Sequence, residues 1–247
     1  MNSSPELLVR RDGAVTRLDM NRPDKGNALS PSLVESLCDA LDAAQSDGTR
    51  LVVLGSTGRH FCTGFDLGDL AAQTDDSLMA RLVRIELLLQ RVHAAPFATL
   101  ALASGRAMGA GADLFAACES RWIVESASFA FPGAGFGIVL GTARLADVVG
   151  AGQARLWITS GGAIDGADAL RAGLATAQVD RNEVEAAISA LAASMSRLDV
   201  QTHAAVRSAS RARGSAGADH DLAALARSAA RPGLKARIEA YRRAAAG

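Results

Sequence analysis

Two glycine-rich segments of this 247-residue chain combine residue types that could stabilise an anion. The first runs from Arg59 to Leu67 and the second from Ser104 to Asp113. Each follows an apolar run typical of a buried strand. Small residues let a ligand approach the backbone, and the first turn of a helix has unpaired N–H groups of partial positive charge. Two such N–H groups directed at one oxygen would stabilise an enolate or a tetrahedral anion.

Asp113 is the titratable residue at the end of the second segment. Its carboxyl could act as a general acid or base if partial burial raises its pKa. A structural carboxylate that favours the positive end of a helix dipole is the alternative. Next to the first loop, His60 is more typical of a loop histidine than of a proton shuttle. Cys62 is typical of a packing residue, because no partner base for its thiol is evident.

Strand and helix patterns alternate along the first part of the chain. An Asp12-Gly13 turn joins two expected strands, and Ser30 followed by Pro31 predicts a helix start. Apolar runs predict two further buried strands, and a long helix is expected between them. This order predicts an α/β fold with helices covering the sheet. The expected ranges are strands at 6–10, 14–20, 50–54, 97–103, 121–124 and 129–131, and helices at 75–93 and from about 112.

Composition excludes several classes of protein. Lys plus Arg (26) equals Asp plus Glu (26), so no net charge favours nucleic acid or an anionic membrane. Three widely spaced cysteines fit neither a disulfide framework nor a CxxC metal site. Neither a signal peptide nor an apolar run of about 18 residues is evident, so we expect a cytoplasmic protein with no membrane partner. Neither a P-loop nor a full GxGxxG motif occurs.

Several motifs, in the same order, resemble those of the enoyl-CoA hydratase/isomerase (crotonase) superfamily over nearly the whole chain. The resemblance implies an α/β, crotonase-like spiral of ββα turns with a C-terminal helical region. Residues 1–177 would form the core with the acyl-CoA site, and residues 178–247 would mediate a homotrimer or a dimer of trimers. The motifs are Asn21–Leu29, Phe61–Leu67, Gly105–Asp113, Phe131–Gly137 and Asp165–Leu174.

The resemblance also implies a substrate and a set of site residues. The substrate would be an acyl-CoA thioester, so coenzyme A would be part of the substrate, and no separate cofactor or metal is expected. Backbone N–H groups of Thr63 and Ala110 would hold the thioester oxygen, and Asp113 would be the acid or base. Basic residues of the C-terminal helix would approach the CoA phosphates. The expected substrate-binding residues are Arg22, Lys25, Ala28, Gly64, Phe65, Asp66, Leu67, Gly109 and Gly133.

The chain departs from the family pattern at one important position. Hydratases of this family use two glutamates; Asp113 takes the place of the first, and Gly133 takes the place of the second. Glycine cannot transfer a proton, which argues against hydration with two acids. Three functions stay open: an enoyl-CoA lyase or isomerase reaction with Asp113 as the acid or base, decarboxylation or thioester hydrolysis, and acyl-CoA binding without turnover. A substitute acid would come from Asp69, Glu86 or Glu119, although Glu86 is expected on a solvated helix face.

Overall fold

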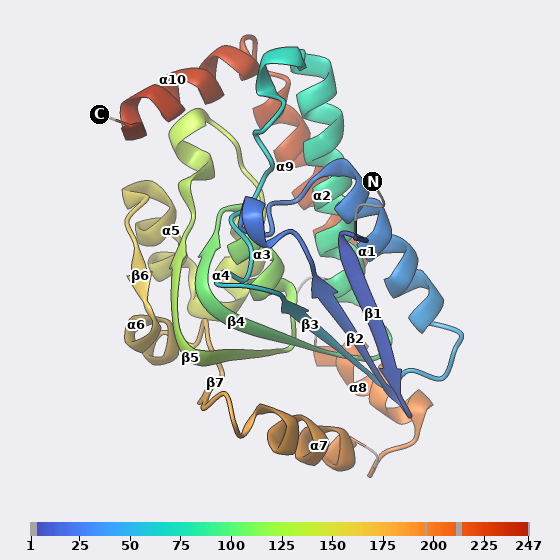
Figure 1. Ribbon diagram of the computed structural model, residues 1–247. Coiled ribbons are helices and arrows are strands. Elements are labelled where there is room, and N and C mark those ends of the chain that lie inside the picture. Colours follow the sequence, from blue (N-terminus) through green and yellow to red (C-terminus); the bar gives the residue numbers. More distant parts are fainter. Residues whose placement is uncertain (1–3, 196, 211–213, 247) are drawn as a thin grey trace.

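The computed structural model describes residues 4–195, 197–210 and 214–246, which form one sheet surrounded by helices (Figure 1). The strands are β1 (Leu7–Asp12), β2 (Val15–Met20), β3 (Leu51–Ser56), β4 (Ala98–Met108), β5 (Ser120–Ala130), β6 (Ile164–Asp165) and β7 (Ala177–Val179). The helices of the first two thirds are α1 (Pro31–Ala44), α2 (Asp75–Ala94), α3 (Ala110–Ala117), α4 (Thr142–Val149), α5 (Ala151–Ser160) and α6 (Gly166–Arg171). They are followed by α7 (Val184–Met195), α8 (Val200–Ser210), α9 (Gly214–Ala229) and α10 (Leu234–Ala246). Short 3₁₀ turns are η1 (Pro23–Lys25), η2 (Leu70–Ala72) and η3 (Pro132–Phe136).

The sheet has the order β1-β2-β3-β4-β5-β6, with β7 also paired to β5. Strands β2, β3, β4 and β5 are parallel, whereas β1 and β6 are antiparallel to their neighbours. Parallel neighbours need a crossover, and here α1, α2 and α3 provide it. The predicted α/β fold with a C-terminal helical region is confirmed.

Strand β3 shows why the inner strands are continuous apolar runs. Successive side chains of a strand point to opposite faces of the sheet. Val52 and Leu54 pack with α1, α2 and α3, whereas Leu51 and Val53 pack with Val184 of α7 on the other face. Both faces are therefore covered, and apolar side chains are needed at every position.

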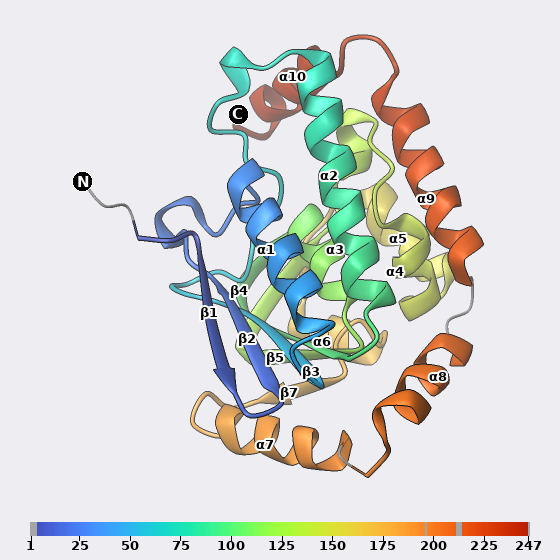
Figure 2. The same cartoon turned by 90° about the vertical axis from the view of Figure 1, so that its right-hand side faces the viewer.

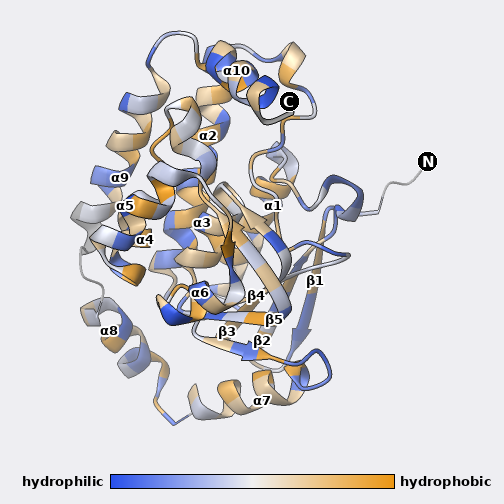
Figure 3. Ribbon diagram, turned by 90° about the vertical axis from the view of Figure 1, so that its left-hand side faces the viewer, coloured by the Kyte–Doolittle hydropathy of each residue, from blue (hydrophilic) through white to orange (hydrophobic). Residues whose placement is uncertain are grey.

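The C-terminal helices α9 and α10 form a third packing unit with α2. Leu225 of α9 and Ile238 of α10 lie in one apolar cluster with Leu78 and Leu82 of α2. In two views at right angles, α10 crosses one end of α2 (Figures 1 and 2). Hydropathy colouring shows that α10 has hydrophilic positions beside apolar ones (Figure 3). The last helix is therefore amphipathic and covers the end of the core where β3 and β4 finish.

Element boundaries differ from the sequence expectation around the second glycine-rich segment. Strand β4 continues to Met108, because Gly105 to Met108 pair with β5 beyond an irregularity at Ala103/Gly105. Helix α3 then begins at Ala110, and β5 is one continuous strand instead of two short ones. The actual turn between β4 and α3 is therefore Gly109 alone. Within the described residues, no helix is long and apolar enough to cross a membrane.

Candidate functional site

The two glycine-rich segments are joined by backbone hydrogen bonds at the carboxyl ends of β3 and β4. The N–H of Phe61 donates to the carbonyl of Ser104 (2.9 Å), and the N–H of Cys62 donates to that of Arg106 (3.2 Å). In return, the Met108 N–H donates to the Cys62 carbonyl (2.9 Å). The crevice at the carboxyl ends of parallel strands is the usual ligand position in α/β folds. The segments predicted to act together therefore do lie side by side.

Gly64 allows the closest approach between these segments. Its φ is +91°, and a Cβ atom there would lie 2.5 Å from the Met108 carbonyl oxygen and 3.4 Å from the Ala110 nitrogen. A side chain would thus require both a strained backbone and a displaced neighbour. Gly109, with φ of +51°, makes the turn into α3. Glycine at these positions brings residues 64 and 65 next to the first turn of α3.

The backbone N–H groups near Gly64 differ in their partners. The Thr63 N–H donates to the carbonyl of Gly26 (3.0 Å). Because this N–H already has an acceptor, the structure argues against Thr63 as an amide donor to a substrate. Neighbouring bonds with Leu29 hold the chain on either side of Phe65. The N–H groups of Phe65 and Ala110 have no acceptor among the described residues. Residues 65 and 110 therefore each have a free amide.

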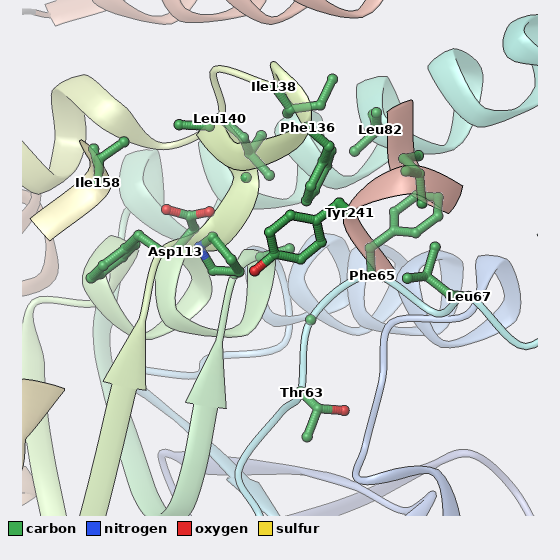
Figure 4. Close-up of a pocket in the computed structure, with 18 of the residues that line it drawn as sticks. Thr63, Phe65, Leu67, Leu82, Asp113, Phe136, Ile138, Leu140, Ile158 and Tyr241 are labelled. Atoms are coloured by element: carbon green, nitrogen blue, oxygen red, sulfur yellow. The ribbon is translucent and has the colours of Figure 1, made fainter. Parts of the chain in front are cut away.

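A largely apolar cavity of about 230 Å³ lies beside these two amides. Figure 4 shows its walls, to which the β3–α2 loop, α3, η3, α5 and α10 all contribute. Apolar walls of this kind suit a hydrocarbon chain. The lining residues are Thr63, Gly64, Phe65, Leu67, Leu82, Gly109, Ala110, Asp113, Phe131, Pro132, Gly133, Ala134, Phe136, Ile138, Leu140, Thr142, Ile158, Ile238, Tyr241 and Arg242.

Asp113 is the carboxylic acid of this cavity wall. It lies one helical turn after Ala110, is only 6% exposed, and has no hydrogen-bond partner for its carboxyl among the described residues. Its oxygen lies against Gly141, where a Cβ atom would be 2.2 Å away. Burial raises the pKa of Asp113 well above its ordinary value; Arg144 opposes this shift and Glu86 adds to it. A buried carboxyl with a raised pKa is a candidate for proton transfer.

An ion cluster is buried behind Asp113. The Arg144 guanidinium donates to both carboxylate oxygens of Glu86 (2.9 and 2.5 Å) and to Asp221 (3.1 Å). The expectation that Glu86 lies on a solvated helix face is wrong, because its side chain is fully buried. Helical periodicity alone does not show this, since the partners come from α4 and α9. The hydrogen-bonded partners of Arg144 are therefore Glu86 and Asp221, and not the nearby Asp113.

A family model described as enoyl-CoA hydratase/isomerase matches residues 10–230 of the chain. The chain belongs to the enoyl-CoA hydratase/isomerase family. A solved structure from Bordetella parapertussis, named as a candidate enoyl-CoA hydratase/isomerase, is 45% identical and superposes with a TM-score of 0.93. That comparison covers 96% of this chain and 98% of the other.

Relatives that are similar in sequence are named after different activities. A protein of Mycobacterium bovis named a probable enoyl-CoA hydratase is 34% identical over 167 residues, which are 66% of each chain. Mouse ethylmalonyl-CoA decarboxylase is 31% identical over 173 residues, 68% of this chain and 53% of the mouse protein. The chain therefore spans about two thirds and about half of these relatives, respectively.

Some residues expected from the family resemblance lie apart from the cavity. Arg22 pairs with Glu6 and with Asp66 (2.8 Å each), so these charges hold the 22–29 loop against the first glycine-rich segment. Burial opposes ionisation of Asp66, but bonds from the Gly68 N–H and Arg22 lower its pKa overall. Ala28 is buried and Lys25 is exposed, and neither lines the cavity.

The other expected residues do meet at the cavity wall. Gly64, Phe65, Leu67 and Gly109 surround the free amides, and Gly133 lies in η3 on the wall as well. Of the acids proposed as substitutes, Asp69 and Glu119 are exposed and do not line the cavity. Within the described chain, Asp113 is thus the carboxyl that this enoyl-CoA hydratase/isomerase family member presents to the cavity.

Two contributions to the site were missed by sequence reasoning. Arg81 of α2 lies over the Phe65 ring (4.4 Å to its centroid) and donates to the Asp66 carbonyl (2.7 Å), which fixes the loop carrying the free amide. Tyr241 and Ile238 of α10 close the cavity. The amphipathic pattern of the last helix was visible in the sequence, but its docking position was not. Of the C-terminal basic residues, Arg242 lines the cavity, whereas Arg237 donates to the Phe136 carbonyl (2.7 Å).

Proposed function

We propose that this protein binds acyl-CoA thioesters and shifts the double bond of an enoyl-CoA. The supporting observation is the pair of unpartnered N–H groups, at Phe65 and Ala110, beside a cavity with one buried carboxyl. In this proposal the thioester oxygen accepts from both N–H groups, and the acyl chain occupies the apolar cavity. Preorganised N–H donors stabilise the negative charge of an enolate without reorganising during the reaction.

The proton transfers require only Asp113. Its ionised carboxyl takes a proton from the α-carbon of a 3-enoyl thioester, and the electron pair of that C–H bond moves into the thioester carbonyl. The resulting dienolate oxygen is held by the amides of residues 65 and 110. Asp113 then returns the proton to the γ-carbon, which gives the 2-enoyl isomer with no atom gained or lost. The raised pKa of Asp113 favours it as a proton carrier, because it both accepts and returns the proton.

A substrate labelled with deuterium at the α-carbon tests this proposal. With 3-hexenoyl-CoA, we expect 2-hexenoyl-CoA in which part of the label is found at the γ-carbon, as measured by mass spectrometry. Asp113→Asn should lower kcat by roughly 10²- to 10⁴-fold, since it removes the general base. The exposed Asp69→Asn is the matched control and should leave kcat unchanged. A normal rate in Asp113→Asn would remove this residue from the mechanism.

Decarboxylation is the second candidate function. It forms a thioester enolate, which the same two amides would hold, when CO₂ leaves the α-carbon, and protonated Asp113 would then deliver a proton to that carbon. The missing second acid at Gly133 and the similarity to mouse ethylmalonyl-CoA decarboxylase both favour it over hydration. A 2-carboxyacyl-CoA included in the same substrate panel separates the two candidates. CO₂ release with no double-bond shift would replace the first proposal by the second.

A further inference from the structure

Asp221 of α9 lies outside the cavity, yet it belongs to the ion cluster buried behind the cavity wall. Its side chain is 8% exposed, and one of its carboxylate oxygens accepts from Nη1 of Arg144 (3.1 Å). The same guanidinium binds both carboxylate oxygens of the buried Glu86. Water and salt screen charges at this depth far less than they screen surface charges. A change of charge at Asp221 is therefore felt by the groups buried around it.

The carboxyl of Asp113 touches the helix that carries Arg144. Gly141 is the N-cap of α4, and a Cβ atom there would lie only 2.2 Å from Oδ1 of Asp113. Arg144 follows within the first turn of this helix. Figure 4 shows Asp113 on the side of the cavity where Leu140 and Ile158 lie. The carboxyls of residues 86, 113 and 221 are thus all buried around one guanidinium.

This ratio of acids to cations implies that one carboxyl holds a proton. Three ionised carboxyls and one guanidinium would leave two uncompensated negative charges away from bulk water, which is strongly unfavourable. Glu86 accepts from Arg144 and from Gln90, and Asp221 accepts from Arg144, so donors stabilise the ionised form of both. Asp113 has no such donor among the described residues. The proton therefore resides on Asp113.

The other elements packed around Asp113 bring no competing buried charge. Among the described residues, β4 and β5 contribute no ionised side chain to the cavity wall, and from α2 the charge that acts on Asp113 is Glu86. Tyr241 and Arg242 of α10 also line the cavity, but Arg242 is exposed, so water screens its charge. Arg144 is therefore the cation that acts on Asp113.

We propose that Asp221 is a positioning residue for Asp113: it holds and neutralises the guanidinium of Arg144, so that the proton of this buried group stays on Asp113. The inference rests on the proposed proton transfer by Asp113. Without the charge of Asp221, Arg144 would have one carboxylate partner, and its remaining positive charge would stabilise the ionised form of Asp113. Asp113 would then be a weaker base. A residue of the C-terminal helix α9 thereby sets the proton affinity of an acid on α3.

The variant Asp221→Asn, which keeps the size of the side chain and removes its charge, tests the inference. Heteronuclear NMR titration of the aspartate carboxyl carbons measures the pKa of Asp113 directly, and Asp113→Asn identifies its signal. We expect this pKa to fall by about one unit in Asp221→Asn and to return toward the wild-type value in Asp221→Glu. Asp219→Asn, at an exposed position of the same helix, is the matched control and should leave the pKa unchanged.

Steady-state kinetics separates this role from a merely structural one. In Asp221→Asn the rising limb of kcat/KM should move to lower pH by the same amount as the pKa. On the high-pH plateau kcat should fall about threefold, because a weaker base takes the α-proton more slowly. KM should stay unchanged, since Asp221 does not line the cavity. A structural role alone would lower the melting temperature without moving the limb, and that result would overturn the inference.

The outcomes also separate this inference from the proposed function. A pKa of Asp113 that is the same in wild type and Asp221→Asn, or that moves equally in Asp219→Asn, would overturn the role of Asp221 and leave the proposed isomerisation standing. A lowered pKa in a protein that turns over no enoyl-CoA would overturn the proposed function, while confirming that Asp221 controls the proton on Asp113.

Discussion

Two neighbouring regions of the molecule bury polar groups, and they differ in how those groups are hydrogen-bonded. Behind the cavity, Glu86, Arg144 and Asp221 bind one another, and Gln90 donates a further bond to Glu86 (2.9 Å). At the cavity wall, the buried carboxyl of Asp113 has no such partner in the described chain. The first arrangement is typical of structural polar groups, and the second of groups reserved for a ligand.

The same difference separates two backbone amides on either side of Gly64. Thr63 donates to Gly26, whereas Phe65 donates to nothing among the described residues. Both amides belong to one short motif, so the motif alone does not show which of them faces a substrate. The hydrogen bonds of the folded chain distinguish the two amides, and they favour Phe65 as the donor in the proposed reaction. The predictions below test whether unpartnered groups carry function and partnered groups carry stability.

The largest effect is expected from replacing single backbone N–H groups by ester oxygens, introduced as α-hydroxy acids. At Phe65 the change should lower kcat about 10²- to 10³-fold, because an oxyanion donor is lost. At Thr63 it should leave kcat within about threefold and lower the free energy of unfolding by about 1 kcal/mol, since only the bond to Gly26 is lost. Steady-state assays and denaturant titration measure the two quantities. The reverse pattern would restore Thr63 as the donor.

A large effect on stability is expected from a substitution at Glu86, the buried acid that is paired with Arg144. Glu86→Gln should lower the free energy of unfolding by about 3 kcal/mol, because it breaks a buried ion pair of Arg144. Glu35→Gln breaks the half-exposed pair with Arg84 and should cost no more than about 1 kcal/mol. Urea denaturation compares the two variants. Equal small losses would mean that the buried cluster is not a structural unit.

The pH dependence of activity should reveal the raised pKa of Asp113. Asp113 must be ionised to take the α-proton, so kcat/KM should rise with pH through its raised pKa. Glu86 contributes to raising that pKa and Arg144 opposes it, so Glu86→Gln should move the rising limb to lower pH. A limb unchanged in this variant would show that the ion cluster does not influence Asp113.

The same shift makes a prediction about stability. The folded-state pKa of Asp113 lies above the ordinary value of 3.8, so the folded state binds this proton more tightly than the unfolded chain does. Its contribution to stability is therefore present below pH 3.8 and is lost as pH rises through the folded-state pKa. The variant Asp113→Asn cannot ionise at this position and therefore does not lose this stability as pH rises. The melting temperature of the variant, relative to that of wild type, should increase with pH. A constant difference between the two melting curves would contradict a raised pKa.

The smallest effect is expected from restoring an acid at Gly133. A Cβ atom there would lie 3.5 Å from the Ile138 carbonyl oxygen, which is an ordinary contact, so a side chain fits. Gly133→Glu should add slow hydration of 2-butenoyl-CoA, detected as 3-hydroxybutyryl-CoA by mass spectrometry. Gly133→Gln, of the same size without the acid, is the control. Hydration in both variants would show that shape and not the carboxyl had been limiting.

The fold could be predicted from the sequence, and so could the grouping of Gly64, Ala110 and Asp113 at one site. These residues lie in local strand-to-helix motifs whose order along the chain is informative. It placed Glu86 wrongly, since the partners of this residue lie on α4 and α9. It missed Tyr241, which reaches the cavity only through the docking of α10. Local sequence patterns predict the residues of the glycine-rich segments. The positions of Glu86 and Tyr241 depend on contacts between segments far apart in the sequence, which local patterns do not contain.

The position of α10 has a consequence for the synthesis of the protein. Ile238 and Tyr241 follow the sheet and both glycine-rich segments in the sequence, so they leave the ribosomal exit tunnel after them. A growing chain can therefore assemble its sheet and both glycine-rich segments while one wall of the cavity is still missing. Acyl thioesters would meet an enclosed cavity only once α10 has docked.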